Sequence, residues 1–228
     1  MKKTMMMLSA TAIIFSVVAT TTRADSAAYG FRLSFMDWEE KSLFDERAQE
    51  DGVQFGPTIR YDFGNRDQFV VGLDAAYGSI GKLDRADFEL LVGFNIAPSF
   101  RLFANLRYLW QDLDQGALDE LERDIKTTGI GAGIGLEGSV PLGYSGFFVF
   151  GSTRVAPMRM KTDVDDSDGT AVLWAYEGGL AYSMIMDTIV ADSTVFFAIG
   201  YRHQQLKGGD FDEKTTMPFV EIGFRQEF

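Results

Sequence analysis

Hydrophobic and polar residues alternate along most of the chain. In "VQFGPTIRYDF", Val53, Phe55, Ile59 and Tyr61 occupy every second position, and polar residues such as Arg60 lie between them. On a helix these apolar side chains would point in all directions, so a period of two predicts a β-strand. The same pattern predicts strands near 28–36, 53–62, 68–78, 87–97, 101–110, 128–140, 146–157, 171–184, 194–204 and 217–228.

Charge is confined to one face of these strands. The apolar face has 48 positions and no charged residue, although about eleven would be charged at the chain average of 24 %. The other face carries the candidate site residues, a lumen charge ladder of Arg32, Arg60, Asp62, Asp74, Glu89, Arg107, Glu137, Arg154, Glu177, Arg202, Glu221 and Arg225.

The composition of the polar face indicates which side meets lipid. A soluble sandwich or lipocalin-like barrel would turn its apolar face inward, and its polar face would carry lysine as well as arginine. Here that face has no lysine but many glycines, such as Gly72, Gly133 and Gly223, which suits a crowded interior. A lipid-facing Lys or Arg at the bilayer centre costs about 2–4 kcal/mol. Backbone groups in lipid must be paired, so the sheet must close. The prediction is an all-β, closed antiparallel transmembrane up-and-down β-barrel of about ten strands, with eight or twelve as alternatives.

The connections between predicted strands alternate in length. Acidic stretches such as "DWEEKSLFDERAQEDG" and "QDLDQGALDELERDIK" predict long loops on the side opposite the two termini, with short turns on the terminal side. Pro57, Pro157 and Pro218 fall inside predicted strands. Because proline cannot donate a ladder hydrogen bond, bulges or strand ends are expected there.

The first residues predict export. Lys2 and Lys3, an apolar stretch from Met5 to Ala19 and the small residues around Ala24 are typical of a cleavable signal peptide, residues 1–24. Residues 25–228 would then form one barrel domain. Without the basic residues of that segment the formal charge falls from −12 to −15, which argues against a nucleic-acid partner. The chain has no cysteine, which suits passage through an oxidising compartment.

The last residues, "EIGFRQEF", resemble the C-terminal assembly signal of bacterial outer-membrane proteins. Glu221, Gly223 and Phe228 match that pattern, and Gln226 departs from it by replacing an aromatic residue. The resemblance implies recognition by periplasmic chaperones and the barrel-assembly machinery, with outer-membrane lipid and lipopolysaccharide as surroundings. As a whole the chain is similar in architecture to the small OmpA-like and opacity-type porin-like barrels. This implies export through the periplasm to a bacterial outer membrane.

Two local motifs carry little chemistry. His203, in "YRHQQ", lacks the neighbouring acid of the omptin proteases and the serine of the lipid A deacylases, so it is interpreted as a polar residue of the barrel rim. "GIGLEG" matches a dinucleotide-binding pattern, but no helix is predicted to follow it. No catalytic residue or cofactor is predicted, and the protein is not expected to be an enzyme.

The acidic stretch "DVDDSDG" contains Asp163, Asp165, Asp166 and Asp168. An EF-hand needs a glycine at its sixth position and a glutamate at its twelfth, where this sequence has Asp168 and Trp174. No specific metal site is therefore predicted. Loose binding of Ca²⁺ or Mg²⁺ beside lipopolysaccharide is the weaker alternative.

The charge ladder leaves three functions open. Its six arginines and six carboxylates can pair across a narrow bore and occlude it, because open aqueous channels are typical of much larger barrels. This favours a structural or surface-interaction barrel with acidic extracellular loops. A narrow porin-like channel for ions or small solutes is the alternative, and an outer-membrane hydrolase is the remote one.

Overall fold

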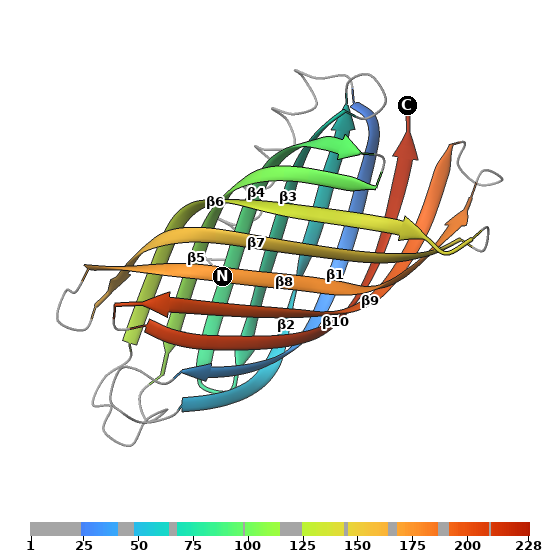
Figure 1. The fold of residues 1–228 in the computed structure, drawn as a ribbon. Helices are drawn as coiled ribbons and strands as arrows, with labels where there is room; N and C mark the ends of the chain where they lie inside the picture. The colour runs from blue at the N-terminus through green and yellow to red at the C-terminus, as the bar shows by residue number, and fades with distance from the viewer. Residues whose placement is uncertain are drawn as a thin grey trace.

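The fold is a closed barrel of ten antiparallel strands, seen in a computed structural model (Figure 1). The structure describes residues 24–40, 48–63, 68–97, 99–114, 125–143, 146–163, 168–186, 192–209 and 211–228. Among them no helix is long and apolar enough to cross a membrane. The strands are β1 (Ala24–Glu40), β2 (Ala48–Phe63), β3 (Phe69–Ile80), β4 (Leu83–Ala97), β5 (Phe100–Leu113), β6 (Ile125–Pro141), β7 (Phe147–Thr162), β8 (Asp168–Ile185), β9 (Ser193–Gly208) and β10 (Phe211–Glu227). The predicted all-β barrel of ten strands is confirmed.

Each strand pairs with its neighbours in sequence, and β1 closes the ring by pairing with β10. We call the end where β1 begins and β10 ends the terminal end, and the opposite end the loop end. The register sets the slant of the strands. A path across the ladders starts at Trp38 on β1 and returns to β1 at Ser26, twelve residues away. It passes through Thr215, Gln204, Ala175, Arg154, Gly135, Phe103, Gly93, Val70 and Asp62.

That stagger determines the tilt of the strands. With the usual rise per residue and strand spacing, a shift of twelve residues over ten strands gives a tilt of about 40°. A tilted strand needs about 9–11 residues to span a bilayer, whereas these strands have between 12 residues in β3 and 18 in β8. The barrel is therefore taller than a membrane.

The predicted strands were too short at the loop end. β1 continues to Glu40 instead of ending at 36, and β10 begins at Phe211 instead of 217. The reason is a reversal of the pattern. In the last residues of β1, Met36 and Trp38 are buried inside the barrel, and Asp37 is exposed outside. The column of lipid-facing apolar residues ends there, although the strand does not.

This extension shortens the connections that were predicted as long acidic loops. Only residues 41–47 separate β1 from β2, and only 209–210 separate β9 from β10. Much of the acidic sequence is strand, so these two connections are shorter than predicted. The connection between β5 and β6, residues 114–124, is long as predicted, and the one between β3 and β4, at the Ser79–Ala86 stretch expected to be short, has only residues 81–82.

The three prolines lie within strands, and the expectation of bulges or strand ends at them is wrong. The register is the same on both sides of each proline, but one of its two ladders is interrupted. The β2–β3 ladder has no partners at Pro57, the β6–β7 ladder has none at Pro157, and the β1–β10 ladder has none at Pro218. Each missing N–H is thus accommodated by a local gap in one ladder.

Candidate functional site

The outer surface of the barrel has a broad apolar band. The uncharged face predicted from the sequence points outward, where Leu106, Ile134 and Ile199 are 59 %, 61 % and 60 % exposed. Aromatic residues lie toward both ends, including Tyr77, Tyr108, Trp174, Tyr176 and Tyr201 toward the loop end. In water so much exposed apolar surface would be unfavourable, and a lipid environment removes that cost.

Inside the barrel, charged side chains form a paired network. All twelve residues of the predicted ladder lie on inward-facing positions and take part in ion pairs. The sequence analysis missed four further members, Arg85, Asp87, Arg101 and Glu213. Together the pairs join eight arginines to eight carboxylates. This equality leaves the paired set with no net charge.

Several of these pairs cross the lumen instead of linking adjacent strands. Arg32 on β1 donates from Nη1 and Nη2 to the carboxylate of Glu177 on β8, at 3.1 Å in each case. Arg101 on β5 donates to Asp62 on β2 at 2.6 Å. Since β1 is separated from β8 by two strands, as is β5 from β2, the side chains span the bore.

Two more pairs lie nearer the loop end and are almost completely buried. Arg154 on β7 pairs with Glu89 on β4, and Arg85 on β4 pairs with Glu213 on β10. Gln204 accepts a hydrogen bond from Arg85 at 3.1 Å, and Gln111 donates one to Glu213 at 2.7 Å. Such groups are stable in a low-dielectric interior only when they are satisfied in this way.

Exposure of the paired charges changes along the barrel axis. The side chain of Arg225, at the terminal end, is 39 % exposed, and that of Arg32, further in, is 15 % exposed. Near the loop end the side chain of Arg85 is only 1 % exposed. The exposure of these side chains therefore decreases from the terminal end toward the loop end.

Apolar side chains fill the lumen at the loop end. One cluster contains Met36, Trp38, Ile80, Leu83, Leu113, Ile125 and Met217. A second contains Leu109, Ala156, Met158, Met160, Ala171, Leu173, Leu206 and Phe211. We call these two clusters together the apolar plug. They draw on nine of the ten strands, all but β2, so apolar side chains from most of the ring meet in the lumen at the loop end.

Inward glycines make room for large side chains nearer the terminal end. A Cβ atom at Gly135 would collide with the ring of Phe103, and one at Gly223 would collide with the ring of Phe196. The glycine-rich polar face predicted from the sequence thus reflects the crowded packing of a narrow lumen.

A small cavity remains at mid-lumen. It is lined by charged residues that include Arg32, Asp74 and Arg107, and by Gln54. Arg107 Nη1 and Gln54 Nε2 are buried and have no hydrogen-bond partner among the described residues. Their free N–H groups could donate to a water molecule or a small solute.

Comparisons with known proteins support the fold. No protein-family model matches the chain, and no curated sequence is significantly similar to it. The β domain of the Bordetella autotransporter BrkA superposes with a TM-score of 0.50 at 11 % identity, covering 90 % of this chain and 100 % of that one. The outer-membrane protease OmpT from Escherichia coli gives 0.48 at 12 % identity, covering 91 % and 98 %. Ail of Yersinia pestis, in complex with the heparin analogue sucrose octasulfate, gives 0.38 at 11 % identity, covering 89 % and 99 %.

The chain has the fold of the bacterial outer-membrane β-barrels. At identities of 11–12 % the likeness concerns the fold alone, and activity must be argued from the side chains.

His203 lies on the outer face of β9 near the loop end. Its ring stacks on Tyr176 with 4.9 Å between centroids, and Nδ1 lies 3.3 Å from Thr216 Oγ1. Within the described part of the chain, no ion pair joins His203 to a carboxylate. These contacts agree with its interpretation as a polar rim residue.

The acidic motif is described only in part. Asp163 follows β7 and accepts a hydrogen bond from the Lys126 amide at 2.8 Å. Asp165 and Asp166 lie outside the described residues, and Asp168 begins β8. In the described ranges no group of three or more His, Cys, Asp or Glu side chains could hold a metal ion.

The three residues of the predicted assembly signal lie on or just after β10. Glu221 points into the lumen, where it accepts hydrogen bonds from Arg32 Nε at 2.9 Å and from Thr58 at 2.7 Å. Gly223 lies against the Phe196 ring, and Phe228 is 69 % exposed. Almost all of the predicted signal peptide, residues 1–24, lies outside the described residues.

Proposed function

We propose that this protein is an integral outer-membrane β-barrel with a largely occluded lumen that serves as a structural or surface-interaction barrel. In this proposal the loop end faces the outside of the cell and the terminal end faces the periplasm. The protein is not an enzyme, and its interactions take place on its outer surface and at the loop end.

The observation that carries the proposal is the way the lumen is filled. Charged side chains with partners across the bore occupy the terminal part and the middle, and the apolar plug occupies the loop end. An ion would have to break paired charges and then enter an apolar constriction, and such constrictions stop conduction by excluding water. Both layers therefore oppose flow.

The second candidate is a narrow porin-like channel for ions or small solutes. The mid-lumen cavity favours it, because that cavity is lined by charges of both signs and by the buried donors of Arg107 and Gln54. This candidate requires the apolar plug to open, which would expose Trp38, Met160 and Leu206, each at most 1 % exposed.

Single-channel recording in a planar bilayer distinguishes the two candidates. The protein is first refolded, and its folding is checked by heat modifiability on a gel. We expect the folded barrel to give no stable conductance steps. If steps occur and their size changes in the Arg107→Gln variant, the lumen charges line an open pathway and the channel replaces the occluded barrel.

A further inference from the structure

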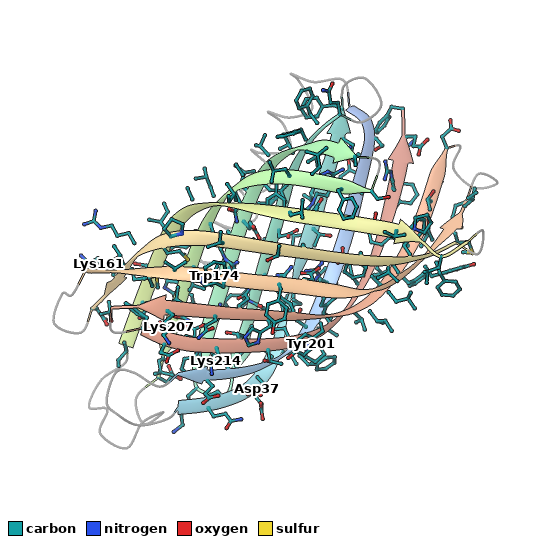
Figure 2. All side chains as sticks on the ribbon, in the orientation of Figure 1. Asp37, Lys161, Trp174, Tyr201, Lys207 and Lys214 are labelled. Atoms are coloured by element: carbon teal, nitrogen blue, oxygen red, sulfur yellow. The ribbon has the colours of Figure 1, made fainter. Side chains whose placement is uncertain are left out.

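The mid-lumen cavity is a small space within a bore that is otherwise filled. Side chains project from the strands into the bore along the length of the barrel (Figure 2), and the ion pairs and the apolar plug occupy it. The cavity has a volume of about 20 Å³. One water molecule needs about 10–15 Å³, so the cavity has room for one water molecule or one ion of similar size and excludes an organic solute.

The side-chain groups left unsatisfied at this cavity are hydrogen-bond donors. Arg107 on β5 and Gln54 on β2 both line it, and the two residues are only 3 % and 4 % exposed. Neither Arg107 Nη1 nor Gln54 Nε2 has a hydrogen-bond partner among the described residues. A buried donor that stays unsatisfied lowers the folding equilibrium constant by roughly fivefold to 100-fold. A ligand that accepts from both atoms would remove that cost.

The carboxylates that line the cavity already accept hydrogen bonds. Both oxygens of Asp74, of Asp87 and of Glu89 have a donor within the barrel. Those of Asp74, for example, accept from Arg60 at 2.8 Å and 3.1 Å. The unmet demand at the cavity is therefore for an acceptor, which a water oxygen or a halide ion would supply.

The charges around the cavity decide between these two acceptors. The lining contains three arginines, Arg32, Arg107 and Arg202, and three carboxylates, so it has no net charge. An anion that enters a neutral, low-dielectric site loses its hydration without a compensating charge. A water molecule costs little to immobilise, and its O–H groups can donate to the remaining lone pairs of the carboxylates. Water is therefore favoured over a halide ion.

The cavity borders the interrupted ladder between β2 and β3. Gly56, Ala75 and Ala76 lie in the gap of that ladder and line the cavity. Gln54 is on β2 beside the gap, and Arg107 is on β5, which two strands separate from β2. A ligand shared by these two side chains would join β2 to β5 across the bore, at the level where the ladder of β2 is interrupted.

We propose that the mid-lumen cavity is a binding site for one water molecule, which accepts hydrogen bonds from Arg107 Nη1 and Gln54 Nε2. The bridge satisfies both buried donors and holds β2 to β5 beside the interrupted ladder. The inference rests on the proposed function, because the site holds its water for long only if the lumen is occluded. It assigns the cavity a structural ligand, in place of a solute on its way through a channel.

Nuclear magnetic resonance of the refolded barrel in detergent micelles tests this assignment. Cross-relaxation with water is measured at the ¹⁵N-labelled side-chain amide of Gln54. A long-lived water molecule gives nuclear Overhauser effects of opposite sign in the laboratory and rotating frames, whereas freely diffusing water gives effects of the same sign. Crystals of the wild type grown in sodium bromide locate any halide ion by its anomalous scattering. Gln54→Met removes the donor at similar volume, and Gln49→Met is the matched control on the exposed face of β2.

We expect effects of opposite sign at Gln54, and an oxygen-sized density peak in the cavity without anomalous signal. Gln54→Met should lower the folding equilibrium constant by roughly fivefold to 100-fold, because it leaves Arg107 Nη1 unsatisfied. The control Gln49→Met should stay within about twofold of the wild type. The wild-type spectra and crystals need no variant, so they decide the question even if Gln54→Met does not fold.

Three outcomes would overturn the proposal. Effects of the same sign at Gln54 would show water that exchanges freely. An anomalous peak in the cavity would assign the site to an anion. No density in the cavity would show that side chains repack to satisfy the two donors. Conductance of the same protein tests the occluded barrel separately. A barrel that conducts and lacks a long-lived water would refute the proposed function, and one that does not conduct but lacks the water would refute this inference alone.

Discussion

The terminal part and the loop end of the barrel use the same ten strands, but on most of these strands the face that is apolar reverses between the two regions. Over the apolar band, residues such as Leu106 and Ile134 point outward and ion pairs such as Arg32–Glu177 fill the lumen. At the loop end, Asp37 and Lys161 point outward, and the buried Trp38 and Met160 fill the lumen.

This difference shows that the surroundings of the barrel, lipid or water, determine which face of a strand is apolar. Lipid accepts only uncharged side chains, so charge in that region must turn inward and be paired. Above the membrane, water surrounds the strands and the usual preference returns, with an apolar core and a polar surface. One chain thus joins a membrane barrel to a short barrel of soluble type.

The largest expected effect on stability is at a buried ion pair in the lumen. Arg154→Ala leaves Glu89 charged in a site where its side chain is 4 % exposed. We expect a loss of about 3–5 kcal/mol in the free energy of unfolding, because an unpaired buried charge is not compensated. Urea unfolding in lipid vesicles, followed by tryptophan fluorescence, measures this loss.

The matched control is Arg225→Ala, whose side chain is 39 % exposed at the terminal end. It should cost no more than about 1 kcal/mol, because water screens that pair. The double variant Arg154→Met/Glu89→Leu should recover most of the loss, since it removes both charges. Equal losses at Arg154 and Arg225 would contradict the exposure gradient along the lumen.

Placing a charge on the outer face should cost more stability in the apolar band than at the loop end, and this difference is smaller than the one expected for the ion pairs. Leu106→Arg places a charge in the middle of the apolar band, where Leu106 is 59 % exposed. We expect a loss of about 2–4 kcal/mol in the free energy of unfolding in vesicles. Gln49→Arg introduces the same positive charge at the exposed loop end of β2. The free energy of unfolding of this variant should stay within about 0.5 kcal/mol of the wild type. Similar losses at both positions would mean that lipid covers the loop end as well.

Much of the membrane-level architecture follows from the sequence pattern, because lipid imposes a strict rule there. The uncharged column predicted ten strands, their outward face and twelve of the inward charges. At the loop end the rule changes, so strand residues such as Trp38 were taken for loop. Arg85 and Glu213 were missed for the same reason, since both lie beyond the predicted strand ends.

Ion-pair partners could not be predicted at all. Arg154 and Glu89 are 65 residues apart in sequence and lie on strands that are not neighbours. Which arginine meets which carboxylate depends on the twelve-residue stagger of the barrel, and a stagger leaves no mark on the alternation within any one strand.

The smallest expected effect on stability is at the prolines, where one of the two hydrogen-bond ladders of the strand is interrupted. The β1–β10 ladder has partners at Ser34 with Phe219 and at Asp37 with Thr216, but none at Pro218. Pro218→Val would supply an N–H toward β1 and add a hydrogen bond of about 0.5–1.5 kcal/mol. Most of this gain is offset, because valine leaves the unfolded chain freer by about 0.4–1 kcal/mol. We therefore expect a net change between about −0.5 and +1 kcal/mol in the free energy of unfolding, together with a slowly exchanging amide at position 218. Ala104→Val is the matched control, because its strand has partners on both sides at that position. A fast-exchanging amide at 218 would show that the neighbouring strands hold the gap open, so the missing donor would not be its cause.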